Sequence, residues 1–313
     1  MKKEEINTDF LTSLKNTTGM LNLRSVLDKS LDTILSRKSG LKWAFKTGWD
    51  NLDTALGCGI PFDTTVTIGA RLRVGKSAFA TRLLLNIFEY NTDVNKIALY
   101  WNWEMPAYQQ GVRIFSGFTH KSVNTLMSAR ESLDELTYQQ CIDFRDNLKE
   151  EYIYFIDKSV SIDQIEEVIR RVRYDNPNFK ILNIFDHTRL IVTKDERTEE
   201  EKLHKFYKAC INWTKHLNCT NIVLSQLGRK LEEDNRNSKY RNPMDSDLFG
   251  ADAVAQCSNI IMLLHRPELY DISVHNGILT EGKIFMDIVK NRDGPITKLI
   301  FEHDLSKNII QSL

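Results

Sequence analysis

From about residue 45 onward, short apolar runs alternate with longer segments in which apolar residues recur every three or four positions. The short runs are typical of buried strands, and the longer segments are typical of amphipathic helices. Strands are predicted at 65–68, 97–103, 152–156, 181–185, 221–224, 260–264, 283–289 and 298–302. Helices are predicted at 76–90, 106–117, 134–150, 161–174 and 199–217. This alternation predicts an α/β fold, with a twisted, mostly parallel sheet and helices on both faces.

The first forty residues have a different pattern. Residues 1–18 are polar and mixed in charge, and residues 19–37 are typical of one amphipathic helix. The apolar stripe of this helix consists of Leu23, Leu27, Leu31, Ile34 and Leu35. We therefore predict two parts, with residues 1–40 forming a tail and a short helix and residues 41–313 forming the α/β domain.

Composition and charge narrow the class of protein only loosely. The 313-residue chain carries 42 Lys and Arg residues against 42 Asp and Glu residues. This neutral balance gives no sign of a polyanionic partner, so any nucleic-acid surface must be local. The sequence contains neither a signal-peptide pattern nor an apolar run of membrane-spanning length, which predicts a soluble cytoplasmic protein with no membrane partner.

The five cysteines are scattered along the chain, and no Cys-x-x-Cys pair occurs. Their odd number is typical of a protein from a reducing compartment. Cys210, His216 and Cys219 lie close in sequence, but a zinc site would need a fourth ligand. We therefore interpret these cysteines as buried helix residues.

Residues 69–77, Gly-Ala-Arg-Leu-Arg-Val-Gly-Lys-Ser, lie between a predicted strand and a predicted helix. A glycine-rich loop in this context predicts a phosphate-binding loop, whose backbone N–H groups and following helix N-terminus hold a triphosphate. Lys76 is expected to reach the β- and γ-phosphates of ATP, and the Ser77 hydroxyl is expected to bind Mg²⁺. The expected nucleotide contacts are Gly69, Ala70, Arg71, Leu72, Arg73, Val74, Gly75, Lys76, Ser77 and Ala78.

One position departs from the strict pattern of such loops. Ala70 stands where the first glycine is usual, and Gly69 lies one place earlier. A glycine-rich turn that opens a helix by chance is the alternative interpretation. The strand and helix predicted on either side favour the phosphate loop.

Two carboxylates follow apolar runs further along the chain. Asp186 ends the strand predicted at 181–185, and beside a phosphate loop it would hold Mg²⁺, usually through water. Glu104 follows the run 97–103, and a carboxylate at the end of a strand can polarise an attacking water. Taken alone, Asp186 could simply open a loop, and Glu104 could be a charge at a helix N-terminus. Three aromatic residues of the run are interpreted as strand core rather than as a base-stacking platform: Tyr100, Trp101 and Trp103.

Five segments, in order along the chain, carry a resemblance to a known family. They are Gly69-Ala70-Arg71 with Gly75-Lys76-Ser77-Ala78-Phe79-Ala80, Trp103-Glu104-Met105-Pro106, Phe185-Asp186-His187, Leu224-Ser225-Gln226-Leu227-Gly228-Arg229, and Lys290-Asn291-Arg292-Asp293-Gly294-Pro295. From about residue 20 to its end, the chain resembles the ATPase domain of DnaB-type replicative helicases. The resemblance implies a RecA-like fold, ring hexamers, and ATP-driven translocation on single-stranded DNA with unwinding at a fork.

The resemblance also implies roles for particular residues. Glu104 corresponds to the catalytic base, and Gln226 corresponds to a sensor of the γ-phosphate. Arg292 corresponds to an arginine finger, and Lys290 to a companion sensor that reaches the nucleotide of the neighbouring subunit. The helix at 19–37 could be a linker helix that packs on an adjacent subunit. Primase and a helicase loader are possible partners, in a bacterial or phage-infected cell.

The segment 246–256 lies where the family has a DNA-contacting loop. In this segment Phe249 stands where the family has arginine, so the basic contact is lost. Contact with DNA through backbone N–H groups remains open at Gly250 and Ala251. Basic residues of the preceding polar loop could compensate or could simply be solvated, and they include Arg229, Lys230, Arg236, Lys239 and Arg241.

The residues leave three functions open. The first is a motor of the replicative-helicase type. The second is a RecA-like ATPase that acts in recombination without unwinding, which ring assembly and unwinding assays would distinguish from the first. The third is a nucleotide-binding scaffold that has lost DNA translocation. Phe249 and the short stretch before the ATPase core support the third function, whereas intact Lys76, Glu104 and Arg292 argue against it.

Overall fold

The structure is a computed structural model. It describes residues 20–40, 42–128, 130, 133–148, 152–187, 191, 198–228 and 242–313. Internal contacts divide the chain into two units, with the boundary between Trp43 and Ala44. In the first unit, α2 (Leu23–Lys38) follows Asn22, whose side-chain oxygen accepts the N–H of Ser25 at 2.8 Å. This N-cap fixes the start of the helix that the apolar stripe predicts.

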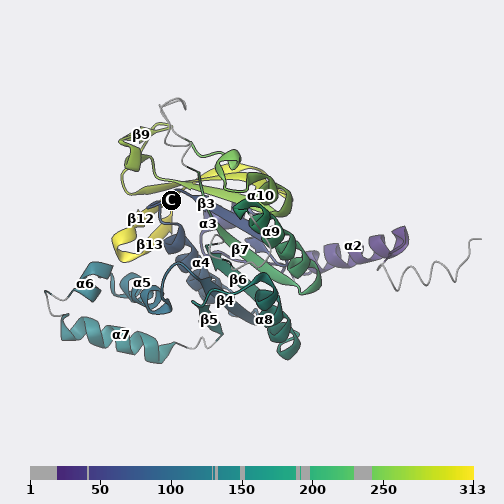
Figure 1. Cartoon of the computed structure of the whole chain (residues 1–313), viewed down its shortest axis with the longest axis horizontal. Helices are drawn as coiled ribbons and strands as arrows, with labels where there is room; N and C mark the ends of the chain where they lie inside the picture. The colour runs from purple at the N-terminus through teal and green to yellow at the C-terminus, as the bar shows by residue number, and fades with distance from the viewer. Residues whose placement is uncertain are drawn as a thin grey trace, which may run out of the picture. The chain divides into compact units, whose positions relative to one another are not determined.

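Among the described residues of the second unit, nine strands form one sheet in the order β13-β12-β11-β8-β3-β7-β6-β4-β5 (Figure 1). The parallel part consists of β3 (Thr65–Ala70), β4 (Lys96–Asn102), β5 (Ile153–Ile156), β6 (Lys180–Asp186), β7 (Cys219–Gln226) and β8 (Ile260–His265). All six strands lie where the apolar runs predict them. The predicted α/β class with a mostly parallel sheet is confirmed.

Antiparallel strands extend the sheet beyond β8. They are β11 (Lys283–Asn291), β12 (Thr297–Asp304) and β13 (Ile309–Ser312). The sequence pattern predicts β11 and β12 but neither their direction nor β13. Because β11 runs against β8, its last residue, Asn291, lies opposite Ile260, the first residue of β8. Outside this sheet, β1 (Ala44–Phe45) pairs with β2 (Ile60–Pro61), and β9 (Val274–His275) pairs with β10 (Ile278–Leu279), both antiparallel.

Helices cover both faces of the sheet, and each face has its own apolar core (Figure 1). On one face lie α3 (Asp50–Ala55) and α4 (Lys76–Tyr90), and on the other lie α8 (Ile162–Asp175), α9 (Glu199–His216) and α10 (Ala251–Cys257). Successive strand residues point to opposite faces. Tyr100 therefore belongs to the first core and Trp101 to the second, and neither is more than 1% exposed. The interpretation of Tyr100 and Trp101 as strand core is confirmed, and Trp103, one residue past the end of β4, is buried in the second core.

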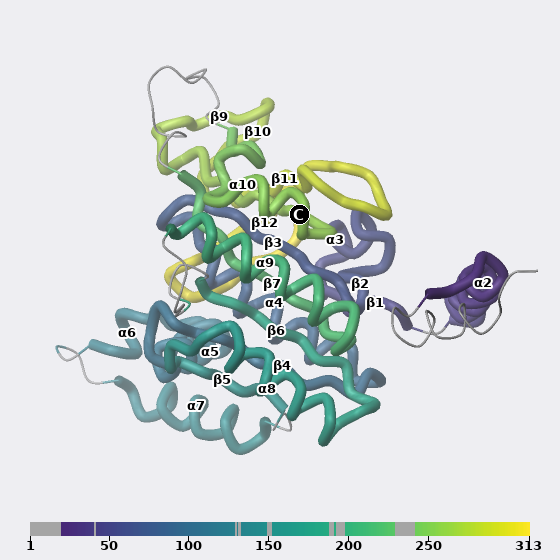
Figure 2. The backbone as a smooth tube through the Cα atoms, turned by 45° about the vertical axis from the view of Figure 1, so that its right-hand side comes forward, coloured from purple at the N-terminus to yellow at the C-terminus, as the bar shows by residue number. Residues whose placement is uncertain are grey.

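A further group of helices lies together beside β5, as Figure 2 shows. It comprises α5 (Ala107–Thr119), α6 (Val123–Met127) and α7 (Glu135–Asn147). The Phe118 ring of α5 packs on the Phe144 ring of α7, with 4.4 Å between ring centroids. Short 3-10 turns form η3 (Asp245–Asp247), η4 (Pro267–Tyr270) and η5 (Leu305–Lys307). The short helices α3, α6 and α10 are not predicted by the sequence pattern, because five to seven residues carry too little periodicity.

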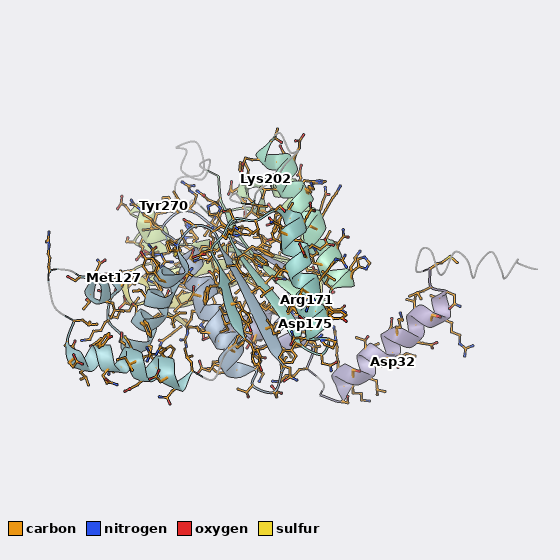
Figure 3. All side chains as sticks on the ribbon, turned by 60° about the horizontal axis from the view of Figure 1, so that its bottom comes forward. Asp32, Met127, Arg171, Asp175, Lys202 and Tyr270 are labelled. Atoms are coloured by element: carbon orange, nitrogen blue, oxygen red, sulfur yellow. The ribbon has the colours of Figure 1, made fainter. Side chains whose placement is uncertain are left out.

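Local signals fix the start and the outer face of the long helices. Ser161 begins α8 with a capping box that includes Gln164. On the outer face of the same helix, Arg171 and Asp175 pair at 2.8 Å (Figure 3), four residues apart on a solvated surface. Within the part of the chain that the structure describes, every helix is too short or too polar to cross a bilayer.

Two of the cysteines lie on α9 and on β7, the strand that follows it. Cys210 is buried on α9, as predicted, but Cys219 is buried on β7, so its assignment to a helix was wrong. The reason is Asn218, whose φ of 47° turns the chain out of the helix. Burial raises the pKa of Cys219 to about 12, which makes this thiol unreactive at neutral pH.

Candidate nucleotide-binding site

The loop between β3 and α4 has the geometry of a phosphate cradle. β3 ends at Ala70, and α4 begins at Lys76. Gly75 precedes the helix with φ 104°, a left-handed conformation that favours glycine, and its carbonyl accepts the N–H of Phe79 at 2.8 Å. The first N–H groups of α4 have no acceptor within the helix. These donors and the positive end of the helix together favour an anion at the loop.

Ala70 is the last residue of β3, at the point where the loop begins. It is 1% exposed, and its carbonyl accepts the N–H of Leu227 at 3.0 Å. Gly69 is the more crowded position, because a Cβ there would lie 2.6 Å from Leu248 Cδ2 and 2.8 Å from Leu263 Cδ2. This crowding explains why the chain has glycine at 69 and tolerates alanine at 70.

The middle of the loop is fixed by bonds to neighbouring strand ends. Arg71 is buried, and its Nη1 donates to the Leu227 carbonyl at 2.9 Å. Arg73 has φ 65°, and its carbonyl accepts a bond from Arg266 Nη1 at 3.0 Å. Between and after these residues, Leu72 is exposed and Val74 is buried. One nitrogen of Arg71 is therefore committed to the backbone of the protein.

Arg266 is a residue of this site that sequence reasoning missed. It follows β8 directly, and its Nε donates to Glu268 Oε1 at 2.8 Å. Glu268 also accepts the N–H of Gly282 at 2.9 Å, so the guanidinium that supports Arg73 is itself held in place. A basic residue after an apolar strand was the available signal. It had no meaning without the knowledge that β8 is the neighbour of β3.

Asp186 and Glu104 come to the same edge of the sheet as the loop. They do so because β4 and β6 are parallel neighbours, with Asn102 opposite Asp186. Asp186 is fully buried, its Oδ2 accepts the Tyr100 hydroxyl at 3.3 Å, and its Oδ1 has no hydrogen-bond partner among the described residues. The Glu104 side chain is 44% exposed, and its Oε2 lies 4.0 Å from His187 Nε2.

Lys76 lies close to both carboxylates. Burial lowers the pKa of its ammonium below the usual value, whereas the charges of Asp186 and Glu104 act in the opposite direction. A buried carboxylate oxygen without a partner and a hydroxyl at the start of α4 are the hard oxygen donors that Mg²⁺ prefers. The residues present therefore fit a magnesium ion held by Asp186 and Ser77.

The loop opens into a cleft of about 410 Å³. Predicted residues that line it are Ala70, Arg71, Leu72, Arg73, Gly75, Lys76, Ser77, Ala78, Glu104 and Gln226. Other lining residues were not predicted: Arg113, Ser122, Val123, Asn124, His187, Leu305, Ser306 and Asn308. His187 follows Asp186 directly and lies in a motif quoted above, although no role was assigned to it. The others lie in or next to α5, α6 and η5, which are far from the loop in sequence, so no local motif marks them.

Lys290 and Arg292 are not part of this cleft. Asn291 pairs with Ile260 of β8, and Ile260 pairs with Val66 of β3. Val66 lies four residues before the end of β3, which is roughly 13 Å along a strand. The antiparallel direction of β11 therefore places Lys290 and Arg292 towards the opposite edge of the sheet from the phosphate loop.

Both basic side chains contact the end of α10. Lys290 Nζ donates to the Ala255 carbonyl, and Arg292 Nη2 donates to the Gln256 carbonyl at 3.1 Å. These bonds satisfy carbonyl groups at the C-terminus of a helix, where cations are favoured. In this subunit the two residues are therefore held against the protein's own backbone.

The predicted DNA-contacting residues lie at the start of α10. Gly250 precedes the helix with φ 66°, and a Cβ there would lie 3.1 Å from Leu203 Cδ1. Phe249 and Ala251 on either side are half-buried. Arg229 and Lys230 lie outside the described residues.

A phosphate loop between a strand and a helix, with acidic residues at the ends of neighbouring parallel strands, defines a nucleotide-binding protein of the RecA-like class. The chain belongs to the DnaB-like helicase C terminal domain family, whose pattern matches residues 44–309. The family resemblance and the RecA-like fold predicted from the sequence motifs are both confirmed.

Individual relatives agree with this assignment. The replicative DNA helicase DnaB of Haemophilus influenzae is 27% identical over 304 residues, which cover 93% of this chain and 61% of that protein. The chain thus spans about three fifths of the length of the curated relatives it matches. In fold, it is similar to the ATPase domain of G40P, with a TM-score of 0.79 at 20% identity over 92% of this chain and 98% of that one. It is also similar to a DnaB-like replicative helicase studied with primase, with a TM-score of 0.78 at 21% identity over 91% of this chain and 66% of that one.

Proposed function

We propose that the chain binds and hydrolyses ATP. The observation that carries this proposal is that Lys76 and Ser77 of the loop line one cleft with Glu104 and Gln226, at the edge of the sheet where β6 ends in Asp186. Lys76 and the loop N–H groups would hold the β- and γ-phosphates. Mg²⁺, when bound by Ser77 and Asp186, would neutralise phosphate charge.

The proposed reaction is the attack of a water on the γ-phosphorus. Glu104 accepts a proton from the water as its oxygen bonds to phosphorus, and the bond from the γ-phosphorus to the bridging oxygen breaks to release ADP. Glu104 suits this role because its side chain lines the cleft and remains partly open to solvent. Gln226, at the end of β7 and directly beside the end of β3, would contact the γ-phosphate.

We propose further that the active form is a ring, with hexamers as the expected size. Arg292 and Lys290 lie towards the edge of the sheet away from their own phosphate loop, so they would serve the nucleotide of a neighbouring copy. A trans arginine stabilises charge on the transferring phosphoryl group. Family membership and the replicative-helicase relatives support this arrangement.

The proposed substrate of the ring is single-stranded DNA, and the proposed activity is that of a replicative helicase. Backbone N–H groups at Gly250 and Ala251 are candidate contacts for DNA phosphates, beside Phe249. Arg229 and Lys230 are candidates by sequence. Primase and a loader are proposed partners, in line with a similar DnaB-like helicase that was studied with primase.

The test is to measure ATP hydrolysis with and without single-stranded DNA, unwinding of a forked duplex, and oligomer mass with and without nucleotide. We expect DNA to raise the ATPase rate, nucleotide to favour rings, and ATP to drive unwinding. Hydrolysis without rings or unwinding would instead identify a RecA-like ATPase of the recombination type. An absence of ATP binding would contradict the proposal as a whole.

A further inference from the structure

A chain of buried polar side chains connects Asp186 to α5. The Tyr100 hydroxyl on β4 donates to Asp186 Oδ2 at 3.3 Å, and Gln110 Nε2 on α5 donates to the Tyr100 oxygen at 3.5 Å. Tyr100 and Gln110 are both 0% exposed. Neither residue belongs to the phosphate loop or to any of the motifs that mark the family.

The same amide of Gln110 is tied to the two elements beside it. Its Oε1 accepts the Thr81 hydroxyl at 3.2 Å, and that hydroxyl also lies 2.8 Å from the carbonyl of Ser77. Its Nε2 also donates to Asn102 Oδ1 at 3.4 Å. Asn102 Nδ2 donates to the Met105 carbonyl at 2.7 Å, which leaves Asn102 Oδ1 as the acceptor that faces Gln110 Nε2. Asn102, at the end of β4, therefore sets the orientation of the Gln110 amide.

These contacts give the Tyr100 hydroxyl a fixed direction. Its oxygen accepts from Gln110, so its single proton is directed to Asp186 Oδ2. The other carboxylate oxygen, Oδ1, is buried and has no hydrogen-bond partner among the described residues. The Tyr100 hydroxyl therefore occupies one oxygen of the carboxylate and leaves Oδ1 for another partner.

Packing alone does not account for a tyrosine at this position. The Tyr100 ring stacks on Phe155, with 5.4 Å between centroids, and its neighbours in this core are apolar. A phenylalanine would make the same ring contacts without burying a hydroxyl, which costs free energy unless it is hydrogen-bonded. The hydroxyl is thus explained by the carboxylate that it contacts.

We propose that Tyr100, oriented by Gln110, is a positioning residue that holds the Asp186 carboxylate with Oδ1 towards the magnesium ion of Mg·ATP. This inference rests on the proposed function, because it deepens the role given there to Asp186. Residues that orient a metal ligand in this way change metal affinity by about 10- to 100-fold when they are removed.

The experiment measures binding rather than turnover. A fluorescent, slowly hydrolysed ATP analogue is titrated into wild type and Tyr100→Phe, first in EDTA and then at increasing Mg²⁺. We expect Tyr100→Phe to bind the analogue in EDTA as wild type does. The Mg²⁺ concentration that gives half of the metal-dependent gain in affinity should rise by roughly 10- to 100-fold.

Tyr207→Phe is the matched control. Tyr207 on α9 is also 0% exposed, and its hydroxyl lies 3.1 Å from Thr67 Oγ1, on the opposite face of the same sheet. This variant also removes a buried hydrogen-bonded hydroxyl from a ring that stays in place. It should lower thermal stability and leave the Mg²⁺ requirement unchanged. An equal shift in both variants would mean general loosening of the core and would overturn the proposal.

Gln110→Met provides a second variant, which keeps the length of the side chain but removes the donor to Tyr100. It should shift the Mg²⁺ requirement in the same direction, by less than Tyr100→Phe. It decides the question if Tyr100→Phe does not fold. A wild-type Mg²⁺ requirement in every folded variant would overturn the positioning role but leave the proposed ATPase intact. Failure of the wild type to bind the analogue in Mg²⁺ would instead contradict the proposed function.

Discussion

The backbones of Phe249 and Gln226 are hydrogen-bonded to each other, with the Phe249 N–H donating to the Gln226 carbonyl at 3.3 Å. Their neighbours in sequence, Leu227 and Leu248, form an isolated antiparallel bridge. Gln226 also lines the nucleotide cleft. The segment that resembles a DNA-contacting loop is therefore attached directly to a strand end that lines the cleft.

This attachment predicts that Gln226 links DNA binding to ATP hydrolysis. The Gln226 side chain is proposed to contact the γ-phosphate, and a movement of Gln226 would displace Phe249 through their backbone hydrogen bond. Gln226→Ala removes the contact with the γ-phosphate. ATP affinity should fall by roughly 10- to 100-fold, because one hydrogen bond to a charged group is lost. Stimulation of ATPase by single-stranded DNA should disappear. Gln140→Ala, at an exposed position on α7, is the control and should keep the stimulation. Stimulation that persists in Gln226→Ala would contradict the link.

Lys76 and Glu104 should separate binding from turnover. Lys76→Ala removes the positive charge that contacts the phosphates, so ATP binding should weaken by roughly 10- to 100-fold. Glu104→Gln keeps the size of the side chain but cannot accept the proton, so binding should persist while turnover falls by about 10²- to 10⁴-fold. Binding isotherms and phosphate release measure the two effects. Normal hydrolysis by Glu104→Gln would exclude it as the base.

The parts of the site that were predictable from sequence depend on short-range signals. The phosphate loop, Asp186 and Glu104 each follow an apolar strand, and the parallel sheet brings the ends of such strands together. Gly75 could be placed because its left-handed φ is a local requirement of the turn into α4. Membership of the family added the assignments of Gln226, Lys290 and Arg292, whose neighbouring residues alone do not define a chemistry.

The remaining parts depend on strand order and direction, which local pattern does not contain. Arg266 contacts Arg73 across 193 positions, because β8 lies next to β3. Tyr100 contacts Asp186 across 86 positions, because β4 lies next to β6. Apolar periodicity predicts that β11 is a strand, but a strand has the same periodicity in either direction. The location of Arg292 relative to its own phosphate loop therefore required the structure.

The free energy of unfolding should fall as the solution is acidified below about pH 6.5, the pKa of an unfolded histidine. Burial lowers the pKa of His303, so the folded state binds a proton less readily than the unfolded state does. Its contribution to stability is complete above pH 6.5 and is lost as pH falls towards the folded pKa, at up to about 1.4 kcal/mol per pH unit. His303→Gln, measured by urea unfolding at pH 7.5 and 5.5, should show a smaller loss. His216→Gln, at an exposed position, should behave as wild type. An equal loss in both variants would assign the pH effect to other groups.

The apolar stripe of α2 should be needed for stable assembly. An exposed apolar stripe of this kind requires a partner surface. The side chains of the stripe are each at least 53% exposed, and they are Leu23, Leu27, Leu31, Ile34 and Leu35. The double substitution Leu27→Glu and Leu31→Glu should shift rings towards smaller species in sedimentation, as should deletion of residues 1–38. Lys29→Glu, on the opposite side of the helix, should not. An unchanged oligomer with lowered thermal stability would mean that the helix docks on its own chain.

Arg292 should act on the nucleotide of a neighbouring subunit. Its separation from Lys76 along the sheet and its bond to Gln256 in its own chain both argue against a role in its own site. Arg292→Ala should therefore bind ATP normally and lose roughly three to five decades of hydrolysis rate. Lys290→Ala should lose less, because a point charge is replaced by water more readily than a bidentate guanidinium.

A mixing experiment distinguishes a trans role from a cis role, because ATPase activity should return on mixing two inactive variants only if Arg292 acts in trans. Arg292→Ala subunits keep a working phosphate loop but offer no finger, whereas Lys76→Ala subunits lack the loop lysine but still offer Arg292. Each variant alone should hydrolyse ATP very slowly. When the two are assembled together, some interfaces join a working loop to a working finger, so part of the activity should return. The control is the double variant Lys76→Ala with Arg292→Ala, which should restore no ATPase activity when it is mixed with either single variant. If Arg292→Ala alone keeps near-wild-type ATPase in rings of verified mass, the finger assignment is wrong, and a subunit completes its own site.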